Sequence, residues 1–143
     1  MIRIRHAGLV TYNLSKSLLF WNKKLKFKIK KRAIESGVLI DNVMGYKSAK
    51  VETLKLSDNK GALLELLHFK NSPLKKKKII KPYSNGFTHI SITVKDIVKT
   101  YMILKKIKIK FNSKPMKSAD GKVMMTYCKT PEGAFLELVE ELF

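Results

Sequence analysis

Two seven-residue segments that agree at five positions constrain the fold of this chain more than any other feature. They are GALLELL at 61–67 and GAFLELV at 133–139, and each carries one acid, Glu65 or Glu137, in an otherwise apolar run. An ionised carboxylate inside an apolar strand is costly unless it is paired, hydrogen-bonded or bound to a metal. The repeat therefore indicates two related modules that place an acid at the same position for the same reason.

Hydrophobic patterns of period 2 and period 3.6 alternate along the chain in an order that occurs twice. The first half predicts a strand at 2–12, a helix at about 14–25, a strand at 27–34, a loop at 36–49, and strands at 50–56 and 62–69. The second half predicts a strand at 86–94, a helix capped by Asp96, and strands at 108–115, 121–129 and 134–140. The predicted fold is α+β, with two tandem β-α-β-β-β modules in one domain: module 1 at about 1–70, a linker at 71–84 and module 2 at about 85–143.

The two halves align at both ends, and the alignment pairs four chemically distinctive residues. An offset of 83 places His6 on His89 in the first strands, and an offset of 72 places Glu65 on Glu137 in the last strands. If the first and last strands of each module lie close together, two imidazoles and two carboxylates converge, which makes a site for a divalent transition metal. His68 has no counterpart in the second half, so we expect it to be a structural residue of its strand.

The net charge of +19 does not by itself indicate a nucleic-acid-binding protein. It comes from 27 Lys and only 3 Arg spread along the chain, whereas base readers favour the Arg fork and single-strand binders interleave exposed aromatic residues. The densest run, at 72–83, is expected to be a solvated connector. The lysine excess instead favours an anionic small-molecule substrate, which long-range attraction would steer to the protein.

No segment reaches the roughly 18 consecutive apolar residues that a membrane helix needs, and the first residues lack the apolar region of a signal peptide. We therefore expect a cytoplasmic protein with no membrane or nucleic-acid partner. The single cysteine, Cys128, excludes an internal disulfide framework and is expected to be a small strand residue without a catalytic role.

The paired modules, with His6 and His89 on first strands and Glu65 and Glu137 on last strands, resemble the vicinal oxygen chelate superfamily. Its members include glyoxalase I, methylmalonyl-CoA epimerase, extradiol dioxygenases and bleomycin resistance proteins. The resemblance covers nearly the whole chain and implies modules whose sheets curl around a metal-binding cleft. It also implies a homodimer, with modules that pair either within one chain or across the two chains.

Two histidines and two glutamates look most similar to the ligand set of glyoxalase I. That resemblance implies one divalent metal per site, with Zn, Ni or Co favoured over Mn or Fe, and a metal-dependent lyase or isomerase that acts through an enolate or enediolate. The metal would act as a Lewis acid while a carboxylate moves the α-proton. Glu137 is the first candidate for this base and Glu65 the second.

Two alternatives from the same superfamily remain open. The stretch IESGV at 34–38 resembles the segment that carries a catalytic glutamate in methylmalonyl-CoA epimerases, so Glu35 is a third candidate catalytic residue, and the substrate would then be an acyl-CoA rather than a thiol adduct. A protein that binds a small molecule without chemistry, as bleomycin resistance proteins do, is the other alternative, although those relatives generally lack the metal ligands.

Overall fold

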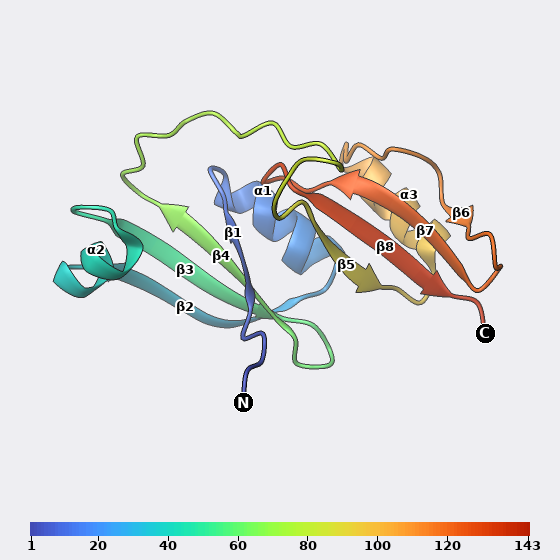
Figure 1. Ribbon diagram of the computed structural model, residues 1–143, viewed down its shortest axis with the longest axis horizontal. Coiled ribbons are helices and arrows are strands. Elements are labelled where there is room, and N and C mark those ends of the chain that lie inside the picture. The colour runs from blue at the N-terminus through green and yellow to red at the C-terminus, as the bar shows by residue number, and fades with distance from the viewer. The chain divides into compact units, whose positions relative to one another are not determined.

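Two compact units, residues 1–76 and 77–143, make up the chain in a computed structural model that describes all 143 residues. Each unit contains one four-stranded mixed sheet, with strand order β1-β4-β3-β2 in the first unit and β5-β8-β7-β6 in the second (Figure 1). The first and last strands of each unit are parallel neighbours, and the other pairings are antiparallel. The predicted α+β class with two tandem modules is confirmed, with one sheet in each module.

The elements are β1 (Ala7–Val10), α1 (Leu14–Leu18), a π-helical segment η1 (Leu19–Lys24), β2 (Lys28–Ser36), α2 (Val38–Met44), β3 (Lys50–Ser57), β4 (Leu63–Phe69), β5 (His89–Thr93), α3 (Ile97–Lys106), β6 (Met116–Lys117), β7 (Val123–Lys129) and β8 (Phe135–Glu141).

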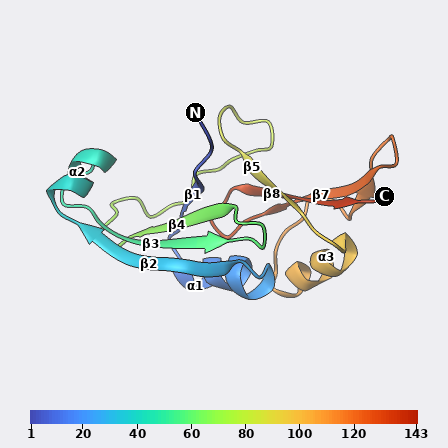
Figure 2. The same ribbon diagram turned by 90° about the horizontal axis from the view of Figure 1, so that it is seen from below.

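Helix α1, with its continuation η1, covers one face of the sheet of the first unit (Figure 2). It begins at Asn13, whose side-chain oxygen accepts a hydrogen bond of 3.0 Å from a backbone N–H of the first turn. The helix then widens into η1, which brings the adjacent aromatic side chains of Phe20 and Trp21 into the core, both fully buried. Leu54 and Leu66 are also fully buried, and register places them opposite each other in β3 and β4.

The helix of the second unit begins with two carboxylates. Asp96 caps α3 through a hydrogen bond of 2.9 Å from a backbone N–H, and Glu140 of β8 accepts one of 2.7 Å from the backbone N–H of Ile97. Negative charge at a helix N-terminus is favourable because the unpaired N–H groups and the helix dipole are positive there. The buried side chains of Ile97, Leu104 and Leu136 belong to the core of this unit.

Both first strands are shorter than the sequence predicts. The strand predicted at 2–12 is limited to β1 and the strand predicted at 86–94 to β5. The reason is the length of the neighbouring strands: β4 begins at Leu63 and β8 at Phe135, so residues before His6 or His89 have no strand beside them. His89 consequently lies at the start of the parallel pairing of its unit, and His6 immediately precedes that of the first unit.

Two other predicted elements are wrong. Helix α2 lies within the segment predicted as a loop at 36–49. Asp41 of this helix accepts hydrogen bonds of 2.8 Å from the backbone N–H groups of Ser48 and Ala49 in the turn that follows. The strand predicted at 108–115 is only an isolated bridge at Phe111, because the chain bends away before Pro115, which has no N–H to donate to a ladder.

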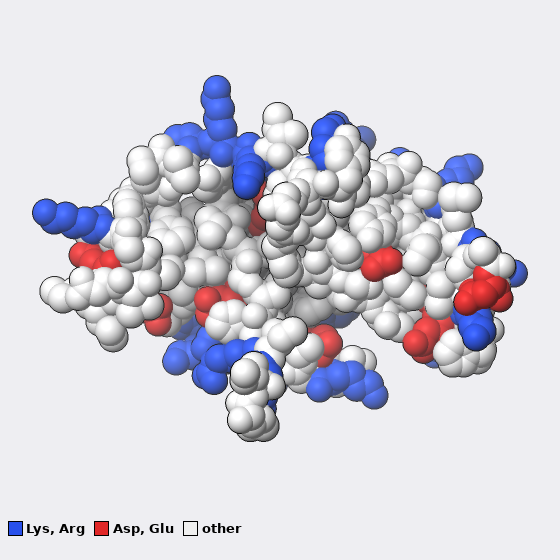
Figure 3. All heavy atoms as spheres, in the orientation of Figure 1, with Lys and Arg blue, Asp and Glu red and all other residues white.

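The connector between the units keeps its lysine side chains exposed but has a fixed contact. Lys129 of β7 donates a hydrogen bond of 2.9 Å to the backbone oxygen of Ile80, while Lys75 to Lys78 are exposed. Burial, and the nearby charges of Lys81 and Lys77, lower the pKa of Lys129. Basic side chains also project from both units (Figure 3). None of the helices has the length and apolar character needed to cross a membrane.

A buried carboxylate in the first unit, Glu52 of β3, is the centre of an ion-pair network. Its side chain is 7% exposed, and it lies 2.6 Å from Nε of Arg32 and 2.8 Å from Nζ of Lys70. The hydrogen bonds from Lys70 and Arg32 outweigh the effect of burial and lower the pKa of Glu52. The charged form is therefore more stable in the folded protein than in the unfolded chain.

We predict that Glu52→Gln reduces the free energy of unfolding at pH 7 by about 1–3 kcal/mol, because two cations lose a charged acceptor. A folded-state pKa below the unfolded one contributes stability that is present above the unfolded pKa and is lost as pH falls through the folded value. The deficit of the variant should therefore shrink below pH 4. Urea unfolding at pH 7 and at pH 3 measures both effects, and Glu141→Gln, at an exposed site, is the control. A deficit that is equal at both pH values would contradict this assignment.

Candidate functional site

In the first unit, the parallel pairing of β1 with β4 brings His6 to Glu65. Gly8 is the register partner of Glu65, and His6 precedes Gly8 by two residues. Because side chains two residues apart in a strand share a face, the imidazole and the carboxylate lie on the same side of the sheet. His6 Nε2 and Glu65 Oε1 are 3.6 Å apart.

The second unit repeats this construction with different neighbours. Ser91 is the register partner of Glu137, and His89 precedes Ser91 by two residues. His89 Nε2 and Glu137 Oε2 are 3.8 Å apart. Of the four predicted ligands, the structure thus brings together one histidine and one glutamate within each unit.

Both pairs lie on the sheet face opposite the helix, and their side chains are partly exposed to solvent. The side chains of Glu65 and Glu137 are 14% and 16% exposed, whereas the histidines are 28% (His6) and 39% (His89) exposed. The leucines on either side of each glutamate are buried in the core of their unit: Leu64, Leu66, Leu136 and Leu138. The acids are therefore held in place by a rigid strand and still reach a face that a ligand can approach.

The chemistry of each pair fits a divalent transition metal. Imidazole nitrogen and carboxylate oxygen are ligands that Zn and its neighbours accept. Separations of 3.6 and 3.8 Å exceed a hydrogen bond, and they are close to the spacing of about 3–3.6 Å between two ligand atoms that each lie about 2.0–2.2 Å from one ion. Within each unit, no third His, Cys, Asp or Glu completes the group, so each unit offers two ligands.

The second ring nitrogen, Nδ1, has different surroundings in the two histidines. Nδ1 of His6 is buried without a hydrogen-bond partner. Nδ1 of His89 lies 3.3 Å from the hydroxyl of Thr88. A metal-bound histidine usually donates its second ring N–H to an acceptor, which fixes the ring. His89 has such a group beside it and His6 does not.

Tyr127 is a residue of this site that the sequence analysis missed. Its hydroxyl lies 3.4 Å from His89 Nε2, the two ring centroids are 5.2 Å apart, and Tyr127 is the register partner of Glu137. Burial, and secondarily the charge of Glu137, raise the pKa of the phenol, so Tyr127 is neutral near pH 7. The offset of 72 that aligns the glutamates pairs Tyr127 with Lys55, the register partner of Glu65, so the repeat gave no signal for this tyrosine.

Three other residues considered from the sequence lie apart from the two pairs. Glu35 is exposed on the edge strand β2, opposite Val51. His68 pairs in register with Glu52, and its Nδ1 is buried without a partner. Cys128 is fully buried, and burial raises its pKa to about 12, so its thiol is not a nucleophile at neutral pH.

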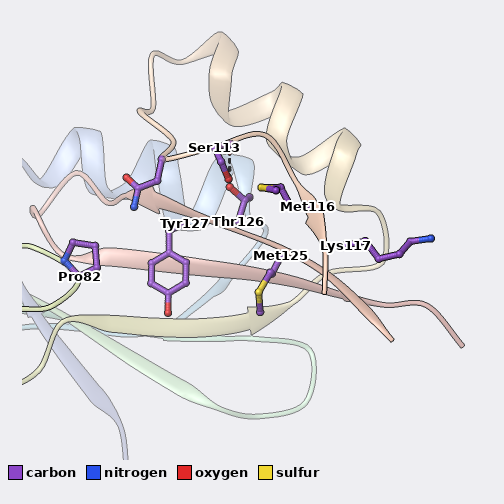
Figure 4. Close-up of a pocket in the computed structure, with 8 residues that line it drawn as sticks. Pro82, Ser113, Met116, Lys117, Met125, Thr126 and Tyr127 are labelled. Atoms are coloured by element: carbon purple, nitrogen blue, oxygen red, sulfur yellow. Dashed lines mark hydrogen bonds between the residues drawn. The ribbon is translucent and has the colours of Figure 1, made fainter. Parts of the chain in front are cut away.

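A cavity of about 360 Å³ in the second unit adjoins the His89–Glu137 pair. Tyr127 lines it and also contacts His89, so the cavity and the pair share this side chain as a wall. Figure 4 shows Tyr127 and Met125 pointing to the same side of β7, whereas the side chain of Lys117 extends away from the other residues drawn. Its lining residues are Pro82, Asn112, Ser113, Met116, Lys117, Met125, Thr126 and Tyr127.

Comparison with solved structures shows a shared fold at low sequence identity. A glyoxalase family protein from Bacillus cereus is 21% identical, with a TM-score of 0.91 over 100% of this chain and 96% of that one. The trypanothione-dependent glyoxalase I of Leishmania major is 19% identical, with a TM-score of 0.66 over 99% and 88%. A glyoxalase I mutant from Zea mays is 18% identical, with a TM-score of 0.69 over 98% of this chain but 48% of that one, so the present chain spans about half its length.

A search of curated proteins by sequence gave no match. The family model described as the Glyoxalase/Bleomycin resistance protein/Dioxygenase superfamily matches residues 3–138, which is nearly the whole chain and includes both His–Glu pairs. Together with the repeated modules and the shared fold, this match shows that the chain belongs to the Glyoxalase/Bleomycin resistance protein/Dioxygenase superfamily.

Proposed function

We propose that the protein is a divalent-metal-dependent lyase or isomerase of the glyoxalase I type, which acts on a small thiol adduct through an enolate or enediolate. The observation that carries the proposal is the repeated His–Glu pair, at 3.6 Å in one unit and 3.8 Å in the other. His6, Glu65, His89 and Glu137 would together hold one ion, with Zn, Ni or Co favoured over Mn or Fe.

Two further observations support the proposal. The pairs are built in the same way on two different sets of neighbours, which packing alone does not require. The superfamily includes enzymes, and two structurally similar proteins are named glyoxalase I. The homodimer and the cytoplasmic location stay predictions.

Each protein group has a defined part in this chemistry. A bound divalent metal supplies a Lewis acid that stabilises negative charge on a substrate oxygen. Glu137 removes the α-proton and holds it on a carboxylate oxygen, and Glu65 is the second candidate for this step. Tyr127, neutral and 3.4 Å from His89, limits the rotation of that imidazole.

The epimerase alternative assigns a second base to Glu35. Register places Glu35 on the same sheet face as Glu65, but two strands across and four positions along, which corresponds to about 16 Å. Opposed bases that share one α-carbon must both lie within hydrogen-bond reach of it. This spacing favours Glu137 or Glu65 as the base, and the isotope experiment below distinguishes the two mechanisms.

We predict that the purified protein carries close to one divalent transition metal per chain and that His6→Ala or His89→Ala loses most of it. Each substitution removes one of four ligands, and the double variant removes both imidazoles. Elemental analysis after dialysis measures the metal content. His68→Ala is the matched control, since His68 is the remaining histidine and belongs to neither pair. Stoichiometric metal in the His6→Ala, His89→Ala double variant would exclude the proposed site.

We also predict that Glu137→Gln lowers turnover by about 10²–10⁴-fold while it reduces metal content far less. The amide keeps an oxygen for the ion but cannot take up the proton. The assay uses thiol adducts of α-ketoaldehydes and 2-substituted acyl-CoA esters in D₂O, with deuterium at the carbon beside the carbonyl detected by mass spectrometry.

The products of this assay distinguish the candidate functions. Glyoxalase-type chemistry gives a rearranged product, whereas epimerase-type chemistry gives deuterium in unrearranged ester and should also be impaired by Glu35→Gln. Tight binding and bound metal with neither exchange nor turnover in either substrate class would refute the enzyme proposal and favour a binding protein.

A further inference from the structure

Three lysines gather at the end of β7, where the connector between the units meets the second sheet. Lys129 is the last residue of β7, whereas Lys77 and Lys81 belong to the connector. Lys81 and Lys77 are the charges that act on Lys129: after burial, they lower its pKa, and no acid raises it. We call these three residues the lysine cluster, and its positive charge attracts anions.

The Lys129 ammonium is held in place by two neutral groups. Its Nζ donates a hydrogen bond of 2.9 Å to the backbone oxygen of Ile80 and lies 4.4 Å from the centroid of the Phe135 ring. An ammonium group has three N–H donors, so these contacts fix the position of the charge without neutralising it. Because the side chain is only partly buried, a ligand can reach a remaining donor.

The segment that supplies the other two lysines is also held by contacts. The stem of Lys77 passes the turn at 130–133 so closely that a Cβ on Gly133 would lie 3.7 Å from its Cδ. The backbone N–H of Lys81 donates a hydrogen bond of 2.9 Å to the hydroxyl of Ser84. This part of the connector therefore does not extend freely into solvent, and its charges stay near the end of β7.

The lysine cluster lies on the sheet face that carries the His89–Glu137 pair. Phe135 is the register partner of both Lys129 and His89, so these three residues form one row across β7, β8 and β5. Neighbouring strands are about 4.8 Å apart, which places the backbone of Lys129 about 10 Å from that of His89. One small molecule can therefore contact the cluster and the His89–Glu137 pair together.

The segment between Lys81 and the pair is lined by neutral side chains. The rings of Phe135 and Tyr127 are neighbours, with centroids 6.3 Å apart, and Tyr127 in turn contacts His89. Pro82, which follows Lys81, lines the same cavity as Tyr127 (Figure 4). The lysine cluster thus continues into the surroundings of the proposed reaction centre.

We infer that the lysine cluster binds a dianionic group of the substrate, such as a phosphate monoester, while the reacting carbon of the same molecule lies at Glu137. Lysine is a common phosphate ligand and acts there as a point charge. Cations that repel one another are stabilised by an anion between them, and more so by two negative charges than by one. A phosphate monoester carries nearly two charges at pH 7.5, since its second pKa is about 6.

The test uses the full chain in EDTA, so that no probe can bind through a metal, and follows backbone amide signals by NMR at pH 7.5 in 0.1 M salt. We expect methyl phosphate to shift the amide signals of Lys77, Lys81 and Lys129 and to leave those of α3 unchanged. Dimethyl phosphate and acetate carry a single charge, so they should bind at least about threefold more weakly. Dimethyl phosphate also represents the diester of a nucleic acid or a lipid.

Paired substitutions test whether the position of the lysines matters. The Lys77→Gln, Lys81→Gln double variant should bind methyl phosphate about three- to tenfold more weakly, as two exposed ion pairs are lost. Both side chains are exposed, so the fold should be retained. The Lys76→Gln, Lys78→Gln double variant removes the same charge from the same run, but neither side chain acts on Lys129, so affinity should change less than about twofold.

The third lysine is tested by Lys129→Met, which keeps an apolar side chain beside Phe135 and removes the fixed charge. It should lose most of the binding of methyl phosphate. The amide signals of α3 show whether the second unit of this variant is still folded.

Equal losses in the two double variants would mean that the run attracts anions through its net charge alone, and this result would overturn the inference. Equal affinity for methyl phosphate and dimethyl phosphate, or no shift at the three lysines, would overturn it as well. The inference rests on the proposed function only in placing the reacting carbon at Glu137. Its failure is distinguishable from failure of that function, because metal content and deuterium exchange are measured separately from binding in EDTA.

Discussion

The parallel pairing of the first and last strands of each unit is the constraint on which the candidate site depends. It places His6 beside Glu65 and His89 beside Glu137, although the members of each pair are 59 and 48 residues apart in the sequence. A shift of one residue in either register would turn the glutamate side chain to the helix-covered face. The leucines that alternate with each glutamate oppose such a shift, because they would leave the core. Burial of these leucines and formation of the His–Glu pairs therefore require the same strand register.

The sequence predicted the parts of the fold that depend on this alternation. The apolar period of 2 with one acid identified both last strands, and the cap residues Asn13 and Asp96 identified both helix starts. It did not predict where the first strands begin, because that depends on where the neighbouring strands start. Helix α2 was missed because turn-forming residues in its segment masked a short helical stretch.

The candidate site was predicted in its residues but not in its surroundings. A repeat identifies what two modules share, so it found the histidines and glutamates. It is silent on positions where the modules differ, and Tyr127 is such a position. The ion-pair network of Glu52 was missed for the same reason, since the equivalent residue in the second unit is Met124.

The differences between the modules bear on which carboxylate acts as the base. Lys55 is the register partner of Glu65, whereas Tyr127, whose phenol is neutral, is the register partner of Glu137. The cavity in the second unit also adjoins the His89–Glu137 pair through Tyr127. A side chain that contacts His89 and lines a cavity is thus present beside Glu137, which supports the proposal that Glu137 rather than Glu65 exchanges a proton with substrate.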